Sequence, residues 1–198
     1  GNEKEASSSE NANALPVVRQ QETATMTPIE RLAAKADGKQ RELIENQRGI
    51  TYFGLFGPYL AGAKKNVVED AYVRKPYQLR NLAEFLEMLL RCKNPDEDIA
   101  VHLVTGHNEP GFVEAQLDGL NELASTFSQL GVNLTYEFRD TLHDRSITAD
   151  TGWEILLGRG LDIFQKFVDG DWLNPLLRHQ QLRRVKECKI TYRRIDEK

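Results

Sequence analysis

Hydrophobic positions recur with two different spacings in the middle of the chain. Short runs rich in β-branched residues at 66–73, 98–105 and 132–138 predict strands. Between them, apolar residues recur at helical spacing over 79–92 and 111–130, which predicts two amphipathic helices. Strand, helix, strand, helix, strand at these distances favours right-handed crossovers between parallel strands. The pattern therefore predicts an α/β domain with a mixed, mostly parallel sheet flanked by helices.

The pattern changes on both sides of this core. Aromatic and aliphatic residues crowd residues 50–60 and predict a short buried helix or helix pair. Further on, 146–148 and 153–157 read as antiparallel strands, and 186–192 as a last strand. Near the start, the capping-box spacing of Thr27-Pro28-Ile29-Glu30 predicts a helix that continues to about residue 46.

These patterns divide the chain into three parts. Residues 1–26 are polar, with few large aliphatic side chains, and are expected to form a disordered linker because they cannot offset the entropy of ordering. Residues 27–48 are predicted as a connecting helix, and residues 49–198 as one α/β domain. Because the chain opens with Gly1 and a polar segment, we expect the domain to belong to a longer protein with a further N-terminal domain.

Composition narrows the class of protein. The 198 residues carry 26 basic and 30 acidic side chains, so the net charge of −4 gives no overall attraction to nucleic acid or to anionic membranes. Cys92 and Cys188 allow one disulfide at most, which favours a reducing, cytoplasmic setting. The chain has no apolar run near the ~20 residues of a membrane-spanning helix. Without a metal-ligand spacing, we expect neither a metal nor a cofactor.

Polar residues follow each predicted parallel strand. Asp70, Tyr72 and Arg74 follow the first strand, residues 105–108 the second, and residues 139–145 the third. In open α/β sheets, ligands bind outside the carboxyl ends of the strands. The three stretches are therefore predicted to surround one crevice.

The third stretch carries the most specific chemistry. His143, Arg145 and Asp150 have the order of a phospholipase D-superfamily half-site, HxKxxxxD, with arginine in place of lysine. In that chemistry one histidine attacks phosphorus and a histidine from a second half-site protonates the leaving group. Only one such half occurs here, and arginine binds phosphate bidentately without reproducing the position of lysine, so the substitution favours binding over turnover. A purely structural alternative pairs the two basic residues with Asp140 or Asp144 at a strand edge.

Six short motifs extend the resemblance over most of the chain. They occur in order at residues 68–74, 78–79, 101–105, 143–145, 152–153 and 158–162. With them, the chain from Tyr52 to about Phe167 closely resembles the phospholipase D-like C-terminal domain of MIT-domain-containing proteins. The resemblance implies a phospholipase D-like fold and, in eukaryotic members, association with acidic membranes without established hydrolase activity. The chain also resembles domains at the C-termini of some prokaryotic ATPase-related or Lon protease-related proteins, which implies such a neighbour in the full-length protein.

The leading hypothesis is a non-catalytic binding and targeting domain for a phosphate-bearing ligand, either an acidic lipid headgroup or a nucleic-acid backbone. The protein would be cytoplasmic or peripherally attached to a membrane. In this hypothesis Arg145, Arg74 and Arg159 contact the anion and His143 is a hydrogen-bonding partner. The remaining predicted site residues are Asp70, Tyr72 and Asp150.

Two alternatives belong to other classes of function. In the first, a homodimer brings together two copies of His143, which would then be the catalytic residue of a phosphodiesterase or nuclease. In the second, the crevice is vestigial and the domain binds other proteins.

Overall fold

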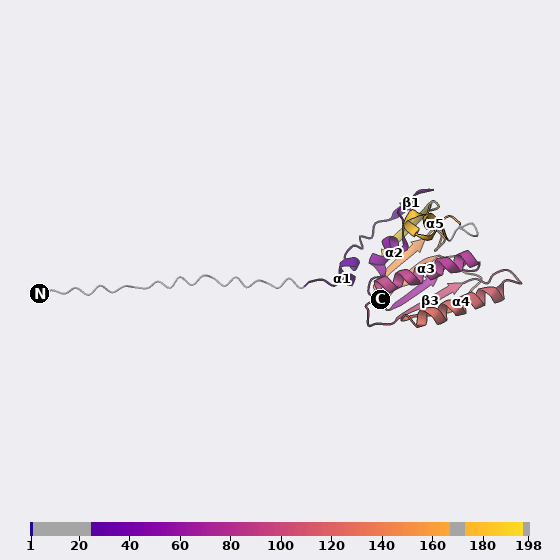
Figure 1. Ribbon diagram of the computed structural model, residues 1–198, viewed down its shortest axis with the longest axis horizontal. Coiled ribbons are helices and arrows are strands. Elements are labelled where there is room, and N and C mark those ends of the chain that lie inside the picture. Colours follow the sequence, from indigo (N-terminus) through magenta and orange to yellow (C-terminus); the bar gives the residue numbers. More distant parts are fainter. Residues whose placement is uncertain (2–24, 167–172, 196–198) are drawn as a thin grey trace.

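The computed structural model describes residues 1, 25–166 and 173–195, and the described chain forms one seven-stranded sheet with helices packed on it (Figure 1). The strand order is β1-β7-β6-β5-β2-β3-β4. The helices are α1 (Pro28–Ala33), α2 (Tyr52–Leu60), α3 (Pro76–Cys92), α4 (Val113–Ser128), α5 (Pro175–Arg178) and the 3₁₀ helix η2 (Gln180–Leu182). The strands are β1 (Arg41–Leu43), β2 (Lys65–Glu69), β3 (Ile99–Thr105), β4 (Val132–Phe138), β5 (Ser146–Ala149), β6 (Trp153–Leu157) and β7 (Cys188–Arg194).

The centre of the fold is the predicted strand–helix–strand–helix–strand unit. β3 pairs in parallel with β2 on one side and with β4 on the other, and α3 and α4 make the two crossovers. α3 buries Leu82, Phe85, Leu86 and Leu89, and α2 and α4 each pack beside it. Figure 1 shows α3 and α4 running side by side across the strands. The predicted α/β fold with a mixed sheet is confirmed.

The other half of the sheet is antiparallel. β5 pairs with β2, β6 with β5, β7 with β6 and β1 with β7, all antiparallel. The expectation of a mostly parallel sheet was therefore wrong, since only the two β3 pairings are parallel. The physical reason is loop length: residues 150–152 connect β5 to β6, and a connection this short permits a hairpin but no crossover. Gly152 adopts a φ of +87° there, which favours glycine.

The segment before residue 49 differs from its prediction. The Thr27–Glu30 capping box is confirmed, but α1 ends at Ala33 and the connecting helix predicted over 27–48 does not form. Gly38 has a φ of +67° and lies against Trp153, where a Cβ would come within 3.4 Å of the indole ring. The chain then enters β1, which pairs with β7 and buries Leu43. Residues 38–43 therefore contact Trp153 and β7 instead of continuing the helix. The predicted linker at 1–26 lies outside the described residues except for residues 1, 25 and 26.

The segment between β6 and β7 contains the two short helices α5 and η2. α5 and η2 pack near α3, where Arg183 Nη1 lies 3.0 Å from both carboxylate oxygens of Glu84. The Arg183 side chain is 5% exposed, and its guanidinium lies 4.5 Å from the centre of the Phe164 ring. Gln180 donates a second hydrogen bond to Glu84 at 2.7 Å and accepts one from the Tyr52 backbone. This buried pair fixes the C-terminal segment on the helix layer.

The two cysteines are free thiols. Cys92 is buried in α3, where burial raises the pKa of its thiol to about 12, and Cys188 is partly buried at the start of β7. A disulfide between them does not form.

One buried polar side chain gives a test of the packing. Asn66 is 2% exposed beneath the helix layer, and neither its amide nitrogen nor its amide oxygen has a hydrogen-bond partner in the described structure. Because an unpaired buried amide costs about 1–3 kcal/mol, we expect Asn66→Val to raise the free energy of unfolding by a similar amount in a urea titration. Asn66→Asp is the control and should lower it, because it buries a charge. A less stable valine variant would contradict this account.

Candidate functional site

Asp70 lies at the end of β2 and connects two loops. Its Oδ1 accepts the backbone N–H of Tyr72 and its Oδ2 accepts that of Leu161, each at 3.0 Å. Asp70 is 2% exposed, and burial raises the pKa of its carboxyl, partly offset by the two N–H groups and by the charge of Arg145. The carboxylate thus connects the loop after β2 to the loop after β6.

Gly160 allows this connection. A Cβ at Gly160 would lie 2.1 Å from Asp70 Oδ2, and the residue has a φ of +60°. Both observations require glycine, because a side chain would collide with the buried carboxylate and strain the backbone. The 158–162 motif therefore forms a loop that closes over the end of β2.

Arg74 and Arg145 both stack on the exposed ring of Tyr72. The guanidinium carbons of Arg145 and Arg74 lie 4.5 Å and 5.0 Å from the centre of the Tyr72 ring, which is 46% exposed. Arg74 also donates from Nε to the Ala71 carbonyl at 2.7 Å and lies directly against Gly106. The structure thus brings four predicted residues together, Asp70, Tyr72, Arg74 and Arg145, at the carboxyl end of β2.

A shallow groove of about 740 Å³ begins at Arg145 and crosses the strands. It lies on the face of the sheet opposite α2, α3 and α4, where alternate residues of β6 and β7 point away from the helices. Its lining consists of Glu69, His143, Asp144, Arg145, Ser146, Glu154, Leu156, Leu157, Gly158, Lys189, Thr191 and Arg193. The predicted His143 and Arg145 therefore occupy one groove.

Most of the carboxylates in the groove are paired. Glu154 forms an ion pair with Arg193, and Glu69 lies 3.8 Å from Arg139. By contrast, neither Arg145 nor Lys189 has a carboxylate within ion-pair distance in the described part of the chain. Cations without an internal partner are available to an anionic ligand.

Two predicted site residues lie elsewhere. Asp150 is at the opposite end of β5 from Arg145, roughly 16 Å along the strand, and accepts the backbone N–H of Lys64. Because β5 separates the two residues, the expected grouping of Asp150 with His143 and Arg145 does not occur. Arg159 donates from Nε to the Glu187 carbonyl at 2.8 Å and does not line the groove.

The structural alternative paired His143 and Arg145 with Asp140 or Asp144, and the described residues do not form these ion pairs. Asp140 accepts the backbone N–H of His107 at 2.8 Å and lies 2.9 Å from its ring nitrogen, and these contacts lower the pKa of the Asp140 carboxyl. Within the described residues, neither Asp140 nor Asp144 forms an ion pair with Arg145.

Lys189, Glu154 and Arg193 were missed by the sequence reasoning. They come from β6 and β7, whose position beside β5 depends on the order of strands in the sheet. The sequence signal for these three residues was their alternation with buried Ile155 and Ile190, which places them on the solvent-facing side of their strands. That alternation does not reveal which strands are neighbours in the sheet.

Two further properties concern the described residues only. They contain no cluster of three or more His, Cys, Asp or Glu side chains suited to a metal ion. None of their helices has both the length and the apolar character needed to span a bilayer.

The seven-stranded mixed sheet and its helix layer are consistent with an α/β domain of the phospholipase D-like class. Residues 49–194 match the family described as the phospholipase D-like domain at the C-terminus of MIT, and the chain belongs to that family. It is 38% identical over 136 residues to mouse (Mus musculus) MIT domain-containing protein 1, a match that covers 67% of this chain and 54% of the mouse protein. The predicted family is confirmed, whereas an ATPase-like or protease-like neighbour stays a prediction.

Asp70→Asn tests whether the buried carboxylate organises the site. An amide has one accepting oxygen for two N–H donors, so one buried donor loses its partner, and we expect the free energy of unfolding to fall by about 1–3 kcal/mol in a urea titration. Hydrogen exchange of the Tyr72 and Leu161 amides should accelerate more than that of amides in β3. The exposed substitution Asp96→Asn is the matched control. Unchanged exchange at both amides would refute this role of Asp70.

Proposed function

We propose that the domain binds a phosphate group, without hydrolysing it, in the groove that begins at Arg145. The observation that carries this proposal is the state of Arg145. Its guanidinium is held on Tyr72 and near buried Asp70, yet it has no carboxylate within ion-pair distance in the described structure. A positioned guanidinium with free donors can bind two phosphate oxygens. His143 and Lys189 line the same groove and would supply further hydrogen bonds.

The lining supports binding rather than turnover. His143 is the only imidazole among the lining residues, whereas phospholipase D-type chemistry uses one histidine to attack and another to protonate the leaving group. The arginine that replaces the half-site lysine supports the same assignment, because its planar fork suits a stable bidentate contact.

The charge pattern favours a compact phosphate over a long polyanion. Glu69, Asp144 and Glu154 lie along the groove and would repel the successive phosphates of a nucleic-acid strand. The lining also contains no Phe, Tyr or Trp on which bases could stack. An acidic lipid headgroup fits these features better. A cytoplasmic protein attached peripherally to a membrane is the setting that this ligand implies.

Arg145→Ala is the direct test. With the full chain, we expect binding to vesicles containing an anionic phospholipid to weaken about tenfold or more, because a hydrogen bond to a charged group contributes about 1.5–3 kcal/mol. Arg145→Lys should keep part of the affinity, since it retains the charge without the fork. Arg159→Ala, which removes an arginine outside the groove lining, is the matched control and should have a smaller effect.

The measurement is vesicle co-sedimentation across a salt series, with neutral vesicles and a single-stranded oligonucleotide as parallel ligands. Equal affinity of the wild-type chain and Arg145→Ala for every ligand would disprove the site. Stronger binding to the oligonucleotide would assign the phosphate to a nucleic acid. Hydrolysis of a phosphodiester that disappears in His143→Ala would instead establish the enzyme alternative.

A further inference from the structure

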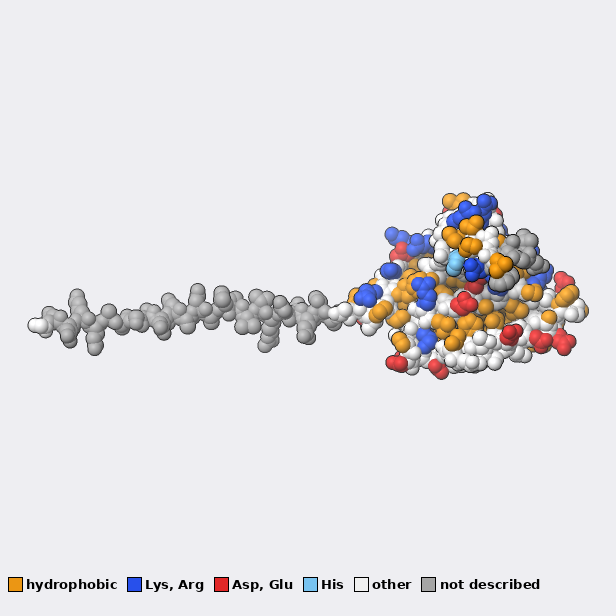
Figure 2. Space-filling view, in the orientation of Figure 1, with side chains coloured by type: hydrophobic (Ala, Val, Ile, Leu, Met, Phe, Trp, Pro, Cys, Tyr) orange, Lys and Arg blue, Asp and Glu red, His pale blue; other side chains and the backbone are white. Residues whose placement is uncertain are grey.

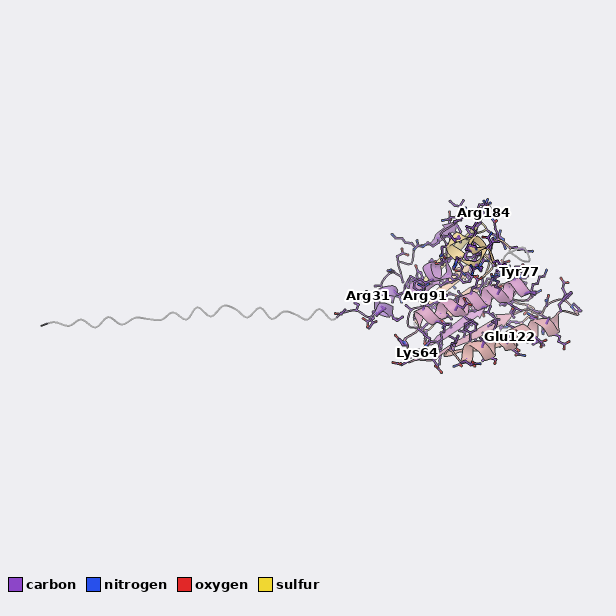
Figure 3. The ribbon with its side chains drawn as sticks, viewed as in Figure 1. Arg31, Lys64, Tyr77, Arg91, Glu122 and Arg184 are labelled. Carbon is purple, nitrogen blue, oxygen red and sulfur yellow. The ribbon has the colours of Figure 1, made fainter. Side chains whose placement is uncertain are left out.

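Two hollows lie beside α3. A groove of about 410 Å³ runs along α3 beside α5 and is lined mainly by charged and polar side chains. The other hollow, the Tyr77 pocket, has a volume of about 400 Å³, and its lining includes Lys75, Tyr77, Asn108, Glu109, Phe112 and Lys166. Figure 3 shows Tyr77 at one end of α3, and Figure 2 shows hydrophobic side chains exposed over α3 and α4 on this side of the molecule. The pocket therefore lies where the loops after β2 and β3 lead into these two helices.

A buried glutamine holds the first wall of the Tyr77 pocket. Gln78 is 9% exposed, and its Oε1 accepts the backbone N–H groups of Arg74 and Lys75 at 3.1 Å and 3.0 Å. Its Nε2 donates to the hydroxyl of Tyr77 at 3.2 Å. Because one buried amide bonds all three residues, Gln78 fixes the loop after β2 and the ring of Tyr77 together. The 78–79 motif thus has a structural role at this pocket.

A second buried glutamine holds the opposite wall. Gln116 of α4 is 1% exposed, and its Nε2 donates to the carbonyls of Val73 and Gly106, each at 2.9 Å. Its Oε1 accepts the backbone N–H of Asn108 at 2.8 Å. The Asn108 amide in turn donates to the Arg74 carbonyl at 3.2 Å, which joins the two loops. Walls held in this way are formed before a ligand binds, and this lowers the entropic cost of binding.

The pocket combines aromatic rings with unpaired charges. The Lys166 ammonium lies 5.1 Å from the centre of the Tyr77 ring, a contact that positions the cation. Phe112, the residue before α4, is 58% exposed. Among the residues that the structure describes, Lys75, Lys166 and Glu109 have no oppositely charged side chain within ion-pair distance. Two cations and one carboxylate are therefore available to a ligand.

These groups match the three parts of a nucleoside monophosphate. An exposed ring such as Phe112 stacks on a base, because every base has a π-face. Lysine ammonium groups such as those of Lys75 and Lys166 bind phosphate oxygens. A carboxylate such as that of Glu109 accepts hydrogen bonds from ribose hydroxyls, as an acidic residue does in dinucleotide-binding folds. The volume of the pocket also falls within the range of about 300–1,000 Å³ that is usual for small-molecule sites.

We propose that the Tyr77 pocket binds a purine nucleoside 5′-monophosphate. The base stacks on Phe112, the ribose hydroxyls bond to Glu109, and the phosphate lies between Lys75 and Lys166. A purine is favoured over a pyrimidine because its two fused rings give a larger stacking area. The site is independent of the groove that begins at Arg145, since the two linings share no residue.

Calorimetric titration of the full chain tests the pocket. We expect AMP or GMP to bind with a dissociation constant below about 1 mM. Ribose 5-phosphate, which lacks the base, and adenosine, which lacks the phosphate, should each bind about tenfold or more weakly than AMP. UMP should also bind more weakly than the purine nucleotides.

Two variants separate the parts of the site. Phe112→Ala should weaken AMP binding about tenfold and leave the binding of ribose 5-phosphate unchanged, because it removes only the stacking surface. Lys75→Ala with Lys166→Ala should weaken AMP binding about tenfold and leave adenosine binding unchanged, because it removes only the phosphate contacts. Leu130→Ala and Lys35→Ala, which truncate exposed side chains outside the pocket lining, are the matched controls.

Thermal melts show whether each variant is folded. Failure of AMP and GMP to bind at about 1 mM would overturn the proposal, as would equal affinity for AMP and ribose 5-phosphate. Nucleotide binding that the folded Phe112→Ala and double-lysine variants both retain would also overturn it, and tighter binding of UMP would refute the purine assignment. Arg145→Ala should leave AMP binding unchanged, which separates this test from that of the phosphate site at Arg145.

Discussion

The arrangement around the groove that begins at Arg145 depends on one buried carboxylate. Asp70 accepts the backbone N–H of Tyr72 in its own loop and that of Leu161, which is 91 residues further along the chain. The desolvated charge makes both hydrogen bonds strong. Tyr72, which follows it, is the surface on which Arg145 and Arg74 stack. Gly160 is required because nothing larger than hydrogen fits against the carboxylate. The family motif at 158–162 is therefore explained by its contact with Asp70.

The second constraint is that α2, α3 and α4 pack together on one face of the sheet. The other face of the sheet is exposed to solvent and carries polar side chains. Most of the carboxylates in its groove form ion pairs with neighbouring basic side chains, as Glu154 does with Arg193. This gives the two faces different properties. The sheet face presents Arg145 beside a shallow groove, and the helix face presents a second groove along α3.

The sequence alone determined much of the fold. The α/β class, α3, α4 and the parallel order of β2, β3 and β4 followed from hydrophobic periodicity, because burial of one helix face and of whole strands leaves a direct record in residue spacing. It also placed Asp70, Tyr72, Arg74 and Arg145 together, because they follow strand ends that meet at one edge. Two of the motifs that carried the family resemblance, at 68–74 and 143–145, contain these residues.

Tertiary structure decided the rest. Residues 41–43 have no strong strand signal and became β1 because β7 offered an unpaired edge. The hairpin from β5 to β6 placed Asp150 at the far end of the strand from Arg145, although the two are close in sequence. Lys189 and Arg193 joined the groove only through the order of strands. Sequence spacing records which side chains a single element buries, whereas the neighbours of that element depend on contacts between distant parts of the chain.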